Sequence, residues 1–438
     1  MRITAFRGAL AATVVTAALL LTGCSAGGST TPKADTGPVD LTYWGWVPNM
    51  DKIVDTWNKA NPKIHVTYVK VDAGDAAATK FLTAIKAGSG APDLMQAEYQ
   101  KIPTMVSANA LADISKVVPA ALKAKFPAGV WSATTLGSKS LYAVPQDSGP
   151  MMFYYRKDVF DALGINSAPA TWDEYAADAA KIHAANPNQF LGTFSAQDAG
   201  QFAGLTQQAG GSWWSSKDGA WSVNIDSAPV KKVAKFWGGL VQSGVIDNQP
   251  QFTPAWNSAL ASGNQVGWVS AVWAPGVLSG DAPQSAGKWV MAPLPQWNPS
   301  APAAGNWGGS AVGISTQSKH VADAVKFDTW LNTNPAAVAQ LVSQGGLYPS
   351  DAVDSKAALA QPSSFFNNQP NFYTLAASIL KTVKPFTYGP NVNVAYSAFN
   401  DDFGKAAQSK QQADFLTAVQ SMQSTTLADL KSSGFKTK

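Results

Sequence analysis

The chain has 438 residues, of which 46% are hydrophobic, 11% aromatic and 14% charged, and its formal net charge is +4. This length exceeds what one ordinary hydrophobic core accommodates, so two lobes are expected. The small, unclustered positive charge excludes a nucleic-acid-binding protein. His65, His183 and His320 are scattered without metal-ligand spacing, so neither a metal nor a cofactor is expected.

The amino terminus has the features of an export signal. Two arginines precede an apolar stretch, residues 9–21, which is too short to span a bilayer. It ends in Leu-Thr-Gly-Cys at 21–24, which resembles the bacterial lipobox, whose cysteine is lipidated and becomes the new amino terminus. Residues 1–23 are therefore predicted to be a lipoprotein signal peptide, and residues 24–38 the lipidated Cys24 with a flexible tether. The predicted location is the outer face of the bacterial cytoplasmic membrane; the alternative is a free cysteine buried in a secreted domain.

The next elements alternate between strand and helix patterns. Strands are predicted at 41–46, 64–68 and 93–96, with helices at 50–60 and from Asp75 to the glycines at 88–90. A β-α-β-α-β order indicates an α/β fold with a mostly parallel sheet, whose ligands meet the loops beyond the carboxyl ends of the strands.

The pattern continues in the second part of the chain. Strands are predicted at 141–145 and 151–155, and Thr171 with Glu174 forms a capping box at the start of a helix. Further helices are predicted at 229–242, 321–331 and 335–343, and a last one from about Gln411.

Several stretches between residues 41 and 350 carry a family pattern by their order and spacing. They include WNKANP at 57–62, AGSGAPD at 87–93, YAVPQDSG at 142–149, PATWDE at 169–174, GNQVGW at 263–268 and NWGGS at 306–310. Together they resemble the bacterial extracellular solute-binding proteins of family 1, the sugar-binding lipoproteins of ABC importers, which are related to maltose-binding proteins. The last ninety or so residues match only loosely.

The resemblance implies a two-lobed periplasmic-binding-protein-like α/β fold with a ligand cleft between discontinuous lobes. The chain would cross between the lobes near 146–149, 295–307 and 345–350. Lobe I would comprise residues 39–147 plus 307–346, and lobe II residues 148–306 plus 347–438. The resemblance also implies hinge closure on the ligand and an ABC permease with separate transmembrane subunits and ATPase as partner. The binding protein itself is expected to be a monomer.

Sugars present flat CH faces and many hydroxyl groups, so their sites need aromatic platforms and planar polar groups. In lobe I and at the first crossing, the candidate ligand-binding residues are Trp46, Glu98, Tyr99, Gln146 and Asp147. The alternatives are an ordinary core tryptophan at 46, a solvated charge at 98 and a structural hinge bond at 147.

The other candidates come from the second lobe and the returning crossing. The expected stacking platforms are Trp213, Trp256, Trp273 and Trp307, and Trp214 could extend the platform of Trp213. At Gly308 and Gly309 the backbone can approach a ligand closely. Trp44, Trp57, Trp172, Trp237 and Trp330 fall inside predicted strands or helices and are expected to pack in cores.

An enzyme is not expected. A glycosidase needs two carboxylates across the scissile bond, and the acidic pairs 173–174 and 401–402 do not fall in predicted cleft loops. Abundant tryptophan with little charge favours a neutral sugar, and several aromatic residues favour an oligosaccharide. A binding protein for a polyol or peptide, or a surface carbohydrate-binding adhesin, stays open as an alternative.

Overall fold

The computed structural model describes residues 37–71, 74–360 and 364–438. Cys24 and the predicted signal peptide lie outside these residues, as does nearly all of the predicted tether. The chain divides into two units, Met1–Ala34 and Asp35–Lys438, and every helix and strand described belongs to the second. No helix in the described ranges is both long enough and apolar enough to cross a membrane.

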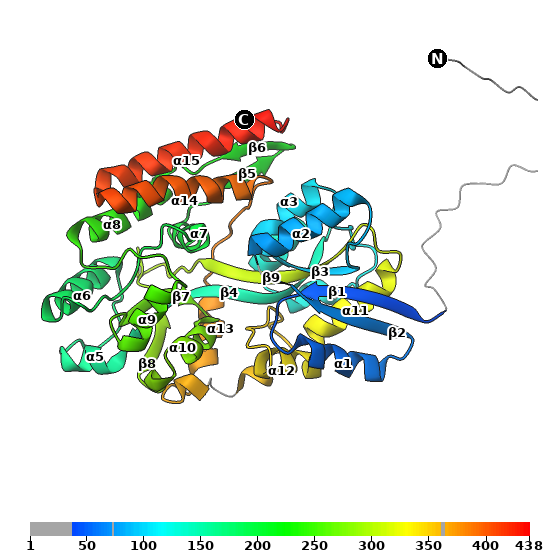
Figure 1. Ribbon diagram of the computed structural model, residues 1–438, viewed down its shortest axis with the longest axis horizontal. Helices are drawn as coiled ribbons and strands as arrows, with labels where there is room; N and C mark the ends of the chain where they lie inside the picture. Colours follow the sequence, from blue (N-terminus) through cyan, green and yellow to red (C-terminus); the bar gives the residue numbers. More distant parts are fainter. Residues whose placement is uncertain (1–36, 72–73, 361–363) are drawn as a thin grey trace, which may run out of the picture. The chain divides into compact units, whose positions relative to one another are not determined.

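A seven-stranded mixed sheet runs through the second unit (Figure 1). Its order is β2-β1-β3-β9-β4-β7, and β8 also pairs with β4. Strands β1, β2 and β3 are parallel, as predicted, whereas β9, β4, β7 and β8 join by antiparallel pairs. The bounds are β1 (Val39–Gly45), β2 (Ile64–Lys70), β3 (Leu94–Glu98), β4 (Ala143–Arg156), β7 (Gly267–Ala271), β8 (Trp289–Pro293) and β9 (Asn306–Ile314).

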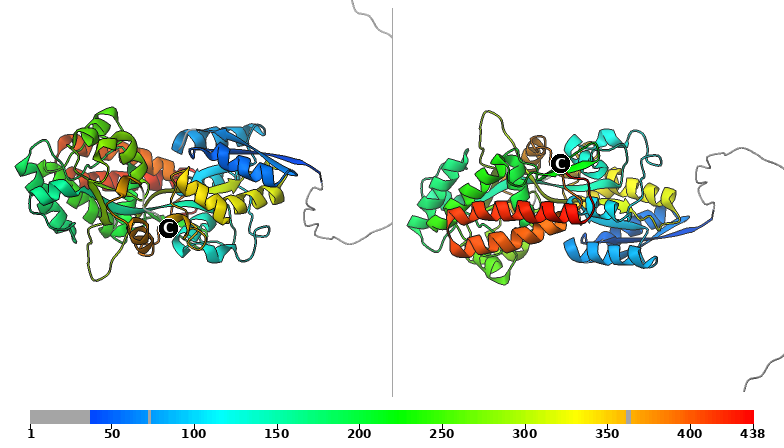
Figure 2. Two further views of the ribbon diagram at one scale, coloured as in Figure 1. Left: turned by 90° about the horizontal axis from the view of Figure 1, so that it is seen from below. Right: turned by 90° about the horizontal axis from the view of Figure 1, so that it is seen from above.

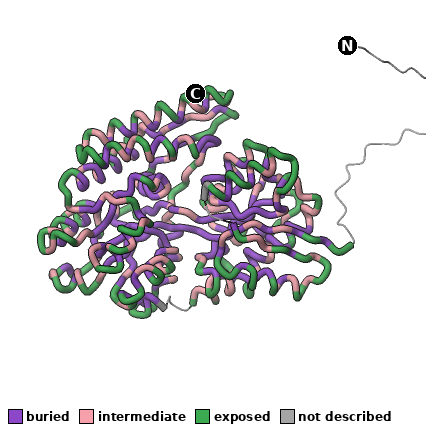
Figure 3. Tube along the Cα trace, viewed as in Figure 1, coloured by how far each residue is buried: buried purple, intermediate pink, exposed green. Residues whose placement is uncertain are grey.

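Strand β4 corrects one prediction. The two strands expected at 141–145 and 151–155 are a single strand of 14 residues, because the intervening residues keep pairing with β9. Register shifts between Pro145 and Asp147 and between Ser148 and Pro150 allow this pairing to continue. Both strands pass through the middle of the unit, and Figure 3 shows this central region as buried.

Three hydrophobic cores surround the sheet. Two of them, formed mostly by residues 39–144 and 311–341, include Trp57 with Phe327 on one face and Phe81 with Ile102 on the other. We call the elements around these two cores lobe I. The third core is formed by residues 151–307 and 348–430, and we call its elements lobe II. The residue bounds proposed for the lobes from the sequence stay a prediction.

The helices of lobe I include those predicted near its start and end. They are α1 (Met50–Ala60), α2 (Gly74–Ala87), α3 (Ile102–Ser107), α4 (Ala128–Thr135), α11 (Val321–Thr333) and α12 (Pro335–Ser343). Trp57 packs against Trp330 of α11 with ring centroids 5.2 Å apart, so both tryptophans serve packing, as expected.

Lobe II contains more helices than the sequence predicted. The expected ones are α6 (Trp172–Ala185), α8 (Ala228–Ser243) and α15 (Gln412–Ser432). The capping box is confirmed, since Thr171 Oγ1 accepts the Glu174 amide at 3.1 Å and the Glu174 carboxylate accepts the Thr171 amide. The others are α5 (Lys157–Ala162), α7 (Ala199–Gln208), α9 (Pro254–Ser262), α10 (Ala274–Asp281), α13 (Phe372–Leu380) and α14 (Val392–Ser409), with a small hairpin of β5 (Trp214–Lys217) and β6 (Ala220–Val223). Helices α14 and α15 lie side by side (Figure 2).

Candidate functional site

Three chain segments meet where the lobes join: β4, β9 and residues 348–350. The Ser148 amide donates to the Tyr348 carbonyl at 2.9 Å, and the Ser350 amide donates to the Gln146 carbonyl at 3.0 Å. Because the lobes are connected through hydrogen-bonded neighbours, a change in their relative orientation must bend this junction.

A side-chain relay ties the loop after β1 to the junction. The Trp46 amide donates to Gln96 Oε1 at 3.0 Å, and Gln96 Nε2 donates to Ser310 Oγ at 2.9 Å. The Ser310 hydroxyl in turn donates to Asp147 Oδ1. The relay holds the half-buried Trp46 at the end of β1, where the sequence predicted a ligand-contacting loop.

Three predicted ligand contacts belong to the junction itself. Burial raises the pKa of Asp147 to about 6, although the Ser310 hydrogen bond opposes this rise. The buried Gln146 amide lies next to the buried Tyr43 hydroxyl. The buried Tyr99 hydroxyl contacts the Asp147 carbonyl at 3.0 Å and Ser350 Oγ at 3.1 Å. In this structure Asp147 makes the hydrogen bonds that the hinge-bond alternative expected, and contact of these three side chains with a ligand stays a prediction.

A cluster of polar side chains spans the two lobes beyond the end of β3, and we call it the polar group: Glu98 and Lys101 of lobe I with Tyr388, Asn393 and Tyr396 of lobe II. Lys101 of lobe I donates to Asn393 Oδ1 of α14 at 2.7 Å, and its ammonium lies 5.5 Å from the centre of the Tyr396 ring. Burial raises the pKa of Tyr388 and Tyr396, and the nearby negative charge of Glu98 raises both further. The predicted candidate Glu98 therefore faces lobe II across the junction.

Asp198 connects this polar group with an aromatic cluster. Its carboxylate caps α7 by accepting the Gln201 amide at 2.9 Å. Burial raises the pKa of Asp198 to about 6, against hydrogen bonds from the α7 backbone and from the side chain of Trp307. Its charge also reaches Tyr396. A carboxylate in this position can accept hydroxyl groups from a ligand held between the lobes.

Five aromatic rings form the cluster: Phe252, Trp256, Trp268, Trp273 and Trp307. The Trp273 and Trp307 centroids are 4.8 Å apart at 71°, and the Trp273 indole N–H donates to the Trp307 carbonyl at 3.0 Å. Phe252 lies 5.6–6.2 Å from the other four rings and is 46% exposed, whereas Trp307 is 7% and Trp256 1% exposed. Phe252, with part of Trp273, thus provides the open ring surface.

Two predicted platforms, Trp213 and Trp256, have rings that are buried in lobe II. The Trp213 indole N–H donates to Thr206 Oγ1 at 3.0 Å, and its neighbour Trp214 is fully buried as well. The Trp256 indole N–H donates to Thr193 Oγ1 at 3.1 Å. Both rings pack in the core of lobe II in this structure, and their contact with a ligand stays a prediction.

Gly308 and Gly309 have positive φ angles of 75° and 86°. A Cβ on Gly309 would come within 2.9 Å of the Tyr99 ring and 3.0 Å of the Asp147 carbonyl, and one on Gly308 would lie 3.4 Å from Trp273 Nε1. The backbone at these glycines therefore approaches other parts of the protein, and its approach to a ligand stays a prediction.

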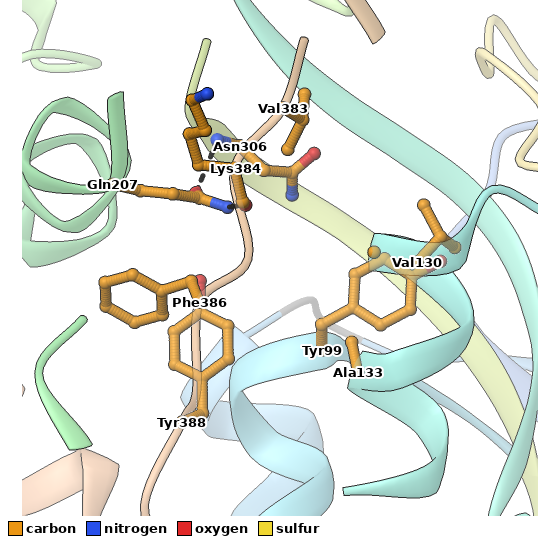
Figure 4. Close-up of a pocket in the computed structure, with 10 residues that line it drawn as sticks. Tyr99, Val130, Ala133, Gln207, Asn306, Val383, Lys384, Phe386 and Tyr388 are labelled. Atoms are coloured by element: carbon orange, nitrogen blue, oxygen red, sulfur yellow. Dashed lines mark hydrogen bonds between the residues drawn. The ribbon is translucent and has the colours of Figure 1, made fainter. Parts of the chain in front are cut away.

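A small cavity lies on the other face of β9, since Asn306 lines it while the next residue, Trp307, points into the aromatic cluster. Figure 4 shows Tyr99, Phe386 and Tyr388 around it. Its volume of about 40 Å³ holds a few water molecules but no sugar. We take as the candidate site the polar group together with the aromatic cluster, which Asp198 connects.

Sequence reasoning missed Asp198, Phe252, Tyr388, Asn393 and Tyr396. Asp198 carried a usable signal, because an acidic residue before a small-residue helix is a typical N-cap. The residues of 383–396 lie in a Pro- and Gly-interrupted stretch that has no periodic pattern.

A family model described as bacterial extracellular solute-binding protein matches residues 45–338. Among curated proteins, the chain is 23% identical over 425 residues to an arabinooligosaccharide-binding protein of Bacillus subtilis, covering 93% of each chain. It is 26% identical over 291 residues to a lactose-binding protein of Rhizobium radiobacter, covering 64% of this chain and 66% of the relative.

Solved structures give the same picture. The galacto-N-biose-/lacto-N-biose I-binding protein of the ABC transporter from Bifidobacterium longum, in complex with lacto-N-biose, superposes with a TM-score of 0.82 at 29% identity, covering 92% of this chain and 100% of the other. An ABC transporter-associated binding protein from B. animalis subsp. lactis, in complex with β-1,6-galactobiose, has a TM-score of 0.79 at 27% identity with the same coverage.

Proposed function

The chain belongs to the bacterial extracellular solute-binding proteins, and from that premise we propose that it captures a neutral oligosaccharide for an ABC importer. As a member of this family it works outside the cytoplasm. The proposed ligand class follows the relatives, whose names specify arabinooligosaccharide, lactose and lacto-N-biose.

One observation carries the proposal: carboxylates from the two lobes, Glu98 and Asp198, both act on Tyr396, and Asp198 also bonds to the side chain of Trp307 in the aromatic cluster. Phe252 and Trp273 offer ring faces for the CH surface of a sugar. Glu98 of lobe I and Asp198 of lobe II can each accept hydroxyl groups, and a carboxylate makes stronger hydrogen bonds than a neutral acceptor. A ligand bound this way contacts both lobes.

Contacts with both lobes favour the closed conformation. In this structure the lobes already touch, because Lys101 bonds to Asn393, and Thr104 Oγ1 donates to the Pro390 carbonyl at 3.0 Å. Ligand binding would stabilise these cross-lobe bonds, and the permease would recognise the resulting closed form. No catalytic step is proposed, since capture and release suffice for transport.

The anchor is part of the same proposal. Lipidation of Cys24 would hold the protein at the outer face of the cytoplasmic membrane, and the permease subunits would be separate chains. A Cys24→Ala variant should leave the membrane fraction for the medium. Continued membrane retention of that variant would contradict the lipid anchor without affecting the ligand proposal.

A calorimetric titration series tests the ligand class. The purified protein is titrated with neutral di- and trisaccharides, a polyol such as sorbitol, and a tripeptide, and hits are repeated with Asp198→Ala. We expect saturable binding of an oligosaccharide that Asp198→Ala weakens about tenfold or more. Binding of only the polyol or the peptide would contradict the sugar assignment. Sugar binding that Asp198→Ala leaves unchanged would show that the sugar site lies elsewhere in the protein.

A further inference from the structure

A second hollow lies beside the third crossing between the lobes, and we call it the hinge pocket. Its volume is about 320 Å³, within the range of small-molecule sites. Pro127 of lobe I forms one wall, Tyr348 and Pro349 of the crossing form a second, and Leu380 of α13 forms a third. It shares no lining residue with the candidate sugar site.

The lining of the hinge pocket is largely apolar and aromatic. The rings of Tyr348 and Tyr373 face one another at 27°, with centroids 6.3 Å apart. Leu359, Leu380 and Ala377 add aliphatic surface, and Ser355 and Thr374 contribute the hydroxyl groups. Flat prolines and tyrosines of this kind favour an aromatic body in the occupant.

The charge of the hinge pocket is positive. Its charged lining residues are Lys356 and Lys381, both exposed to solvent. Within the described parts of the chain, neither ammonium has a carboxylate in ion-pair distance, whereas the neighbouring Lys125 pairs with Asp354. Two uncompensated ammonium groups at the rim of an apolar hollow complement an anion with an apolar body.

The hinge pocket is also coupled to the junction by its position. The backbone of Tyr348 accepts the Ser148 amide of β4, and Asp147 forms a β-bridge with Pro349. Its walls come from both lobes, so their separation depends on how the lobes are oriented. The pocket exists here together with the cross-lobe bond between Lys101 and Asn393.

We propose that the hinge pocket binds an aromatic carboxylate and that its occupation favours the closed arrangement of the lobes, which raises the affinity for the transported sugar. The binding half stands on the hinge pocket alone. The coupling half rests on the proposed function, because a ligand that prefers one conformation changes the affinity of every other ligand that shares that preference.

The binding half is tested with 2-naphthoate as the probe, titrated calorimetrically into the purified protein without sugar. We expect one-to-one binding with a Kd of about 1 mM or tighter. The double variant Lys356→Met, Lys381→Met should weaken it about fivefold or more, and Ala377→Phe, which fills the hinge pocket, should abolish it. The double variant Lys59→Met, Lys63→Met, at and just after the end of α1, is the matched control for the loss of two exposed charges. Absence of saturable binding, or binding that both hinge-pocket variants leave unchanged, overturns the site.

The coupling half is tested by titrating the sugar with and without saturating 2-naphthoate. We expect the sugar Kd to fall about fivefold or more, and this gain to be lost in Ala377→Phe. Probe binding with an unchanged sugar Kd overturns the coupling. Failure of every sugar to bind contradicts the proposed function instead, because the probe titration contains no sugar and stands by itself.

Discussion

Phe252 provides the sharpest test of the proposed site. It is 46% exposed beside four tryptophan rings and has a φ of 63°, a conformation that is strained for a bulky residue. Side chains held in strained backbone conformations concentrate at functional sites, where the surrounding structure must maintain them. We expect Phe252→Ala to weaken oligosaccharide binding.

The expected size follows from the exposed surface. A phenylalanine buries about 150–250 Å² when it is fully covered, so its exposed part amounts to roughly 70–110 Å². A sugar face that covers half of this gains about 1 kcal/mol at ~25 cal/mol per Å². The Kd should therefore rise about fivefold to tenfold.

The assay is calorimetric titration of the best-binding oligosaccharide into wild type, Phe252→Ala and Phe252→Gly. Both variants should lose the same affinity for the oligosaccharide. The free energy of unfolding of Phe252→Gly should be about 1 kcal/mol larger than that of Phe252→Ala, because glycine tolerates positive φ. Val117→Ala removes another exposed apolar side chain, 40% exposed in lobe I, and should leave the Kd unchanged. Less than a twofold change for Phe252→Ala would refute the assignment of this ring to the ligand.

Three further outcomes are expected. Trp273→Phe removes the hydrogen bond to the Trp307 carbonyl and should lower the unfolding free energy by about 1 kcal/mol in denaturant titrations; an unchanged midpoint would show that the bond contributes nothing. Burial raises the pKa of Asp198 from 3.8 to about 6, so the folded state binds this proton more tightly than the unfolded state does. The free energy of unfolding should therefore fall as pH rises from about 4 to 6, by at most about 3 kcal/mol. Asp198→Asn should reduce that fall, and an identical pH profile would contradict the shifted pKa. Thr171→Ala removes a helix cap and should cost about 1 kcal/mol of stability while leaving the sugar Kd unchanged, so a changed Kd would place α6 in the site.

The sequence predicted local structure better than it predicted the site. The parallel β1-β2-β3 unit and the capping box depend on neighbouring residues, so their patterns were sufficient. The contact between Lys101 and Asn393 joins residues 292 positions apart, and no local pattern indicates it. Tryptophans 213 and 256 show the same limit, since a position after glycines or in the first turn of a helix does not distinguish a core ring from a platform.

The junction combines features that favour bending between the lobes with contacts that hold them together. A Cβ at Gly149 would lie 2.1 Å from the Trp307 carbonyl, so β4 and β9 can pair this closely only because this position lacks a side chain. The register shifts on both sides of Ser148 interrupt the regular ladder at the same place. Bulged positions bend more easily than a regular ladder, whereas the β-bridge from Asp147 to Pro349 and the Tyr99 hydroxyl, which contacts both Asp147 and Ser350, tie the strands to the third crossing. Bending should therefore concentrate at residues 146–149, and the hydrogen bonds of the junction should persist in both the open and the closed arrangement.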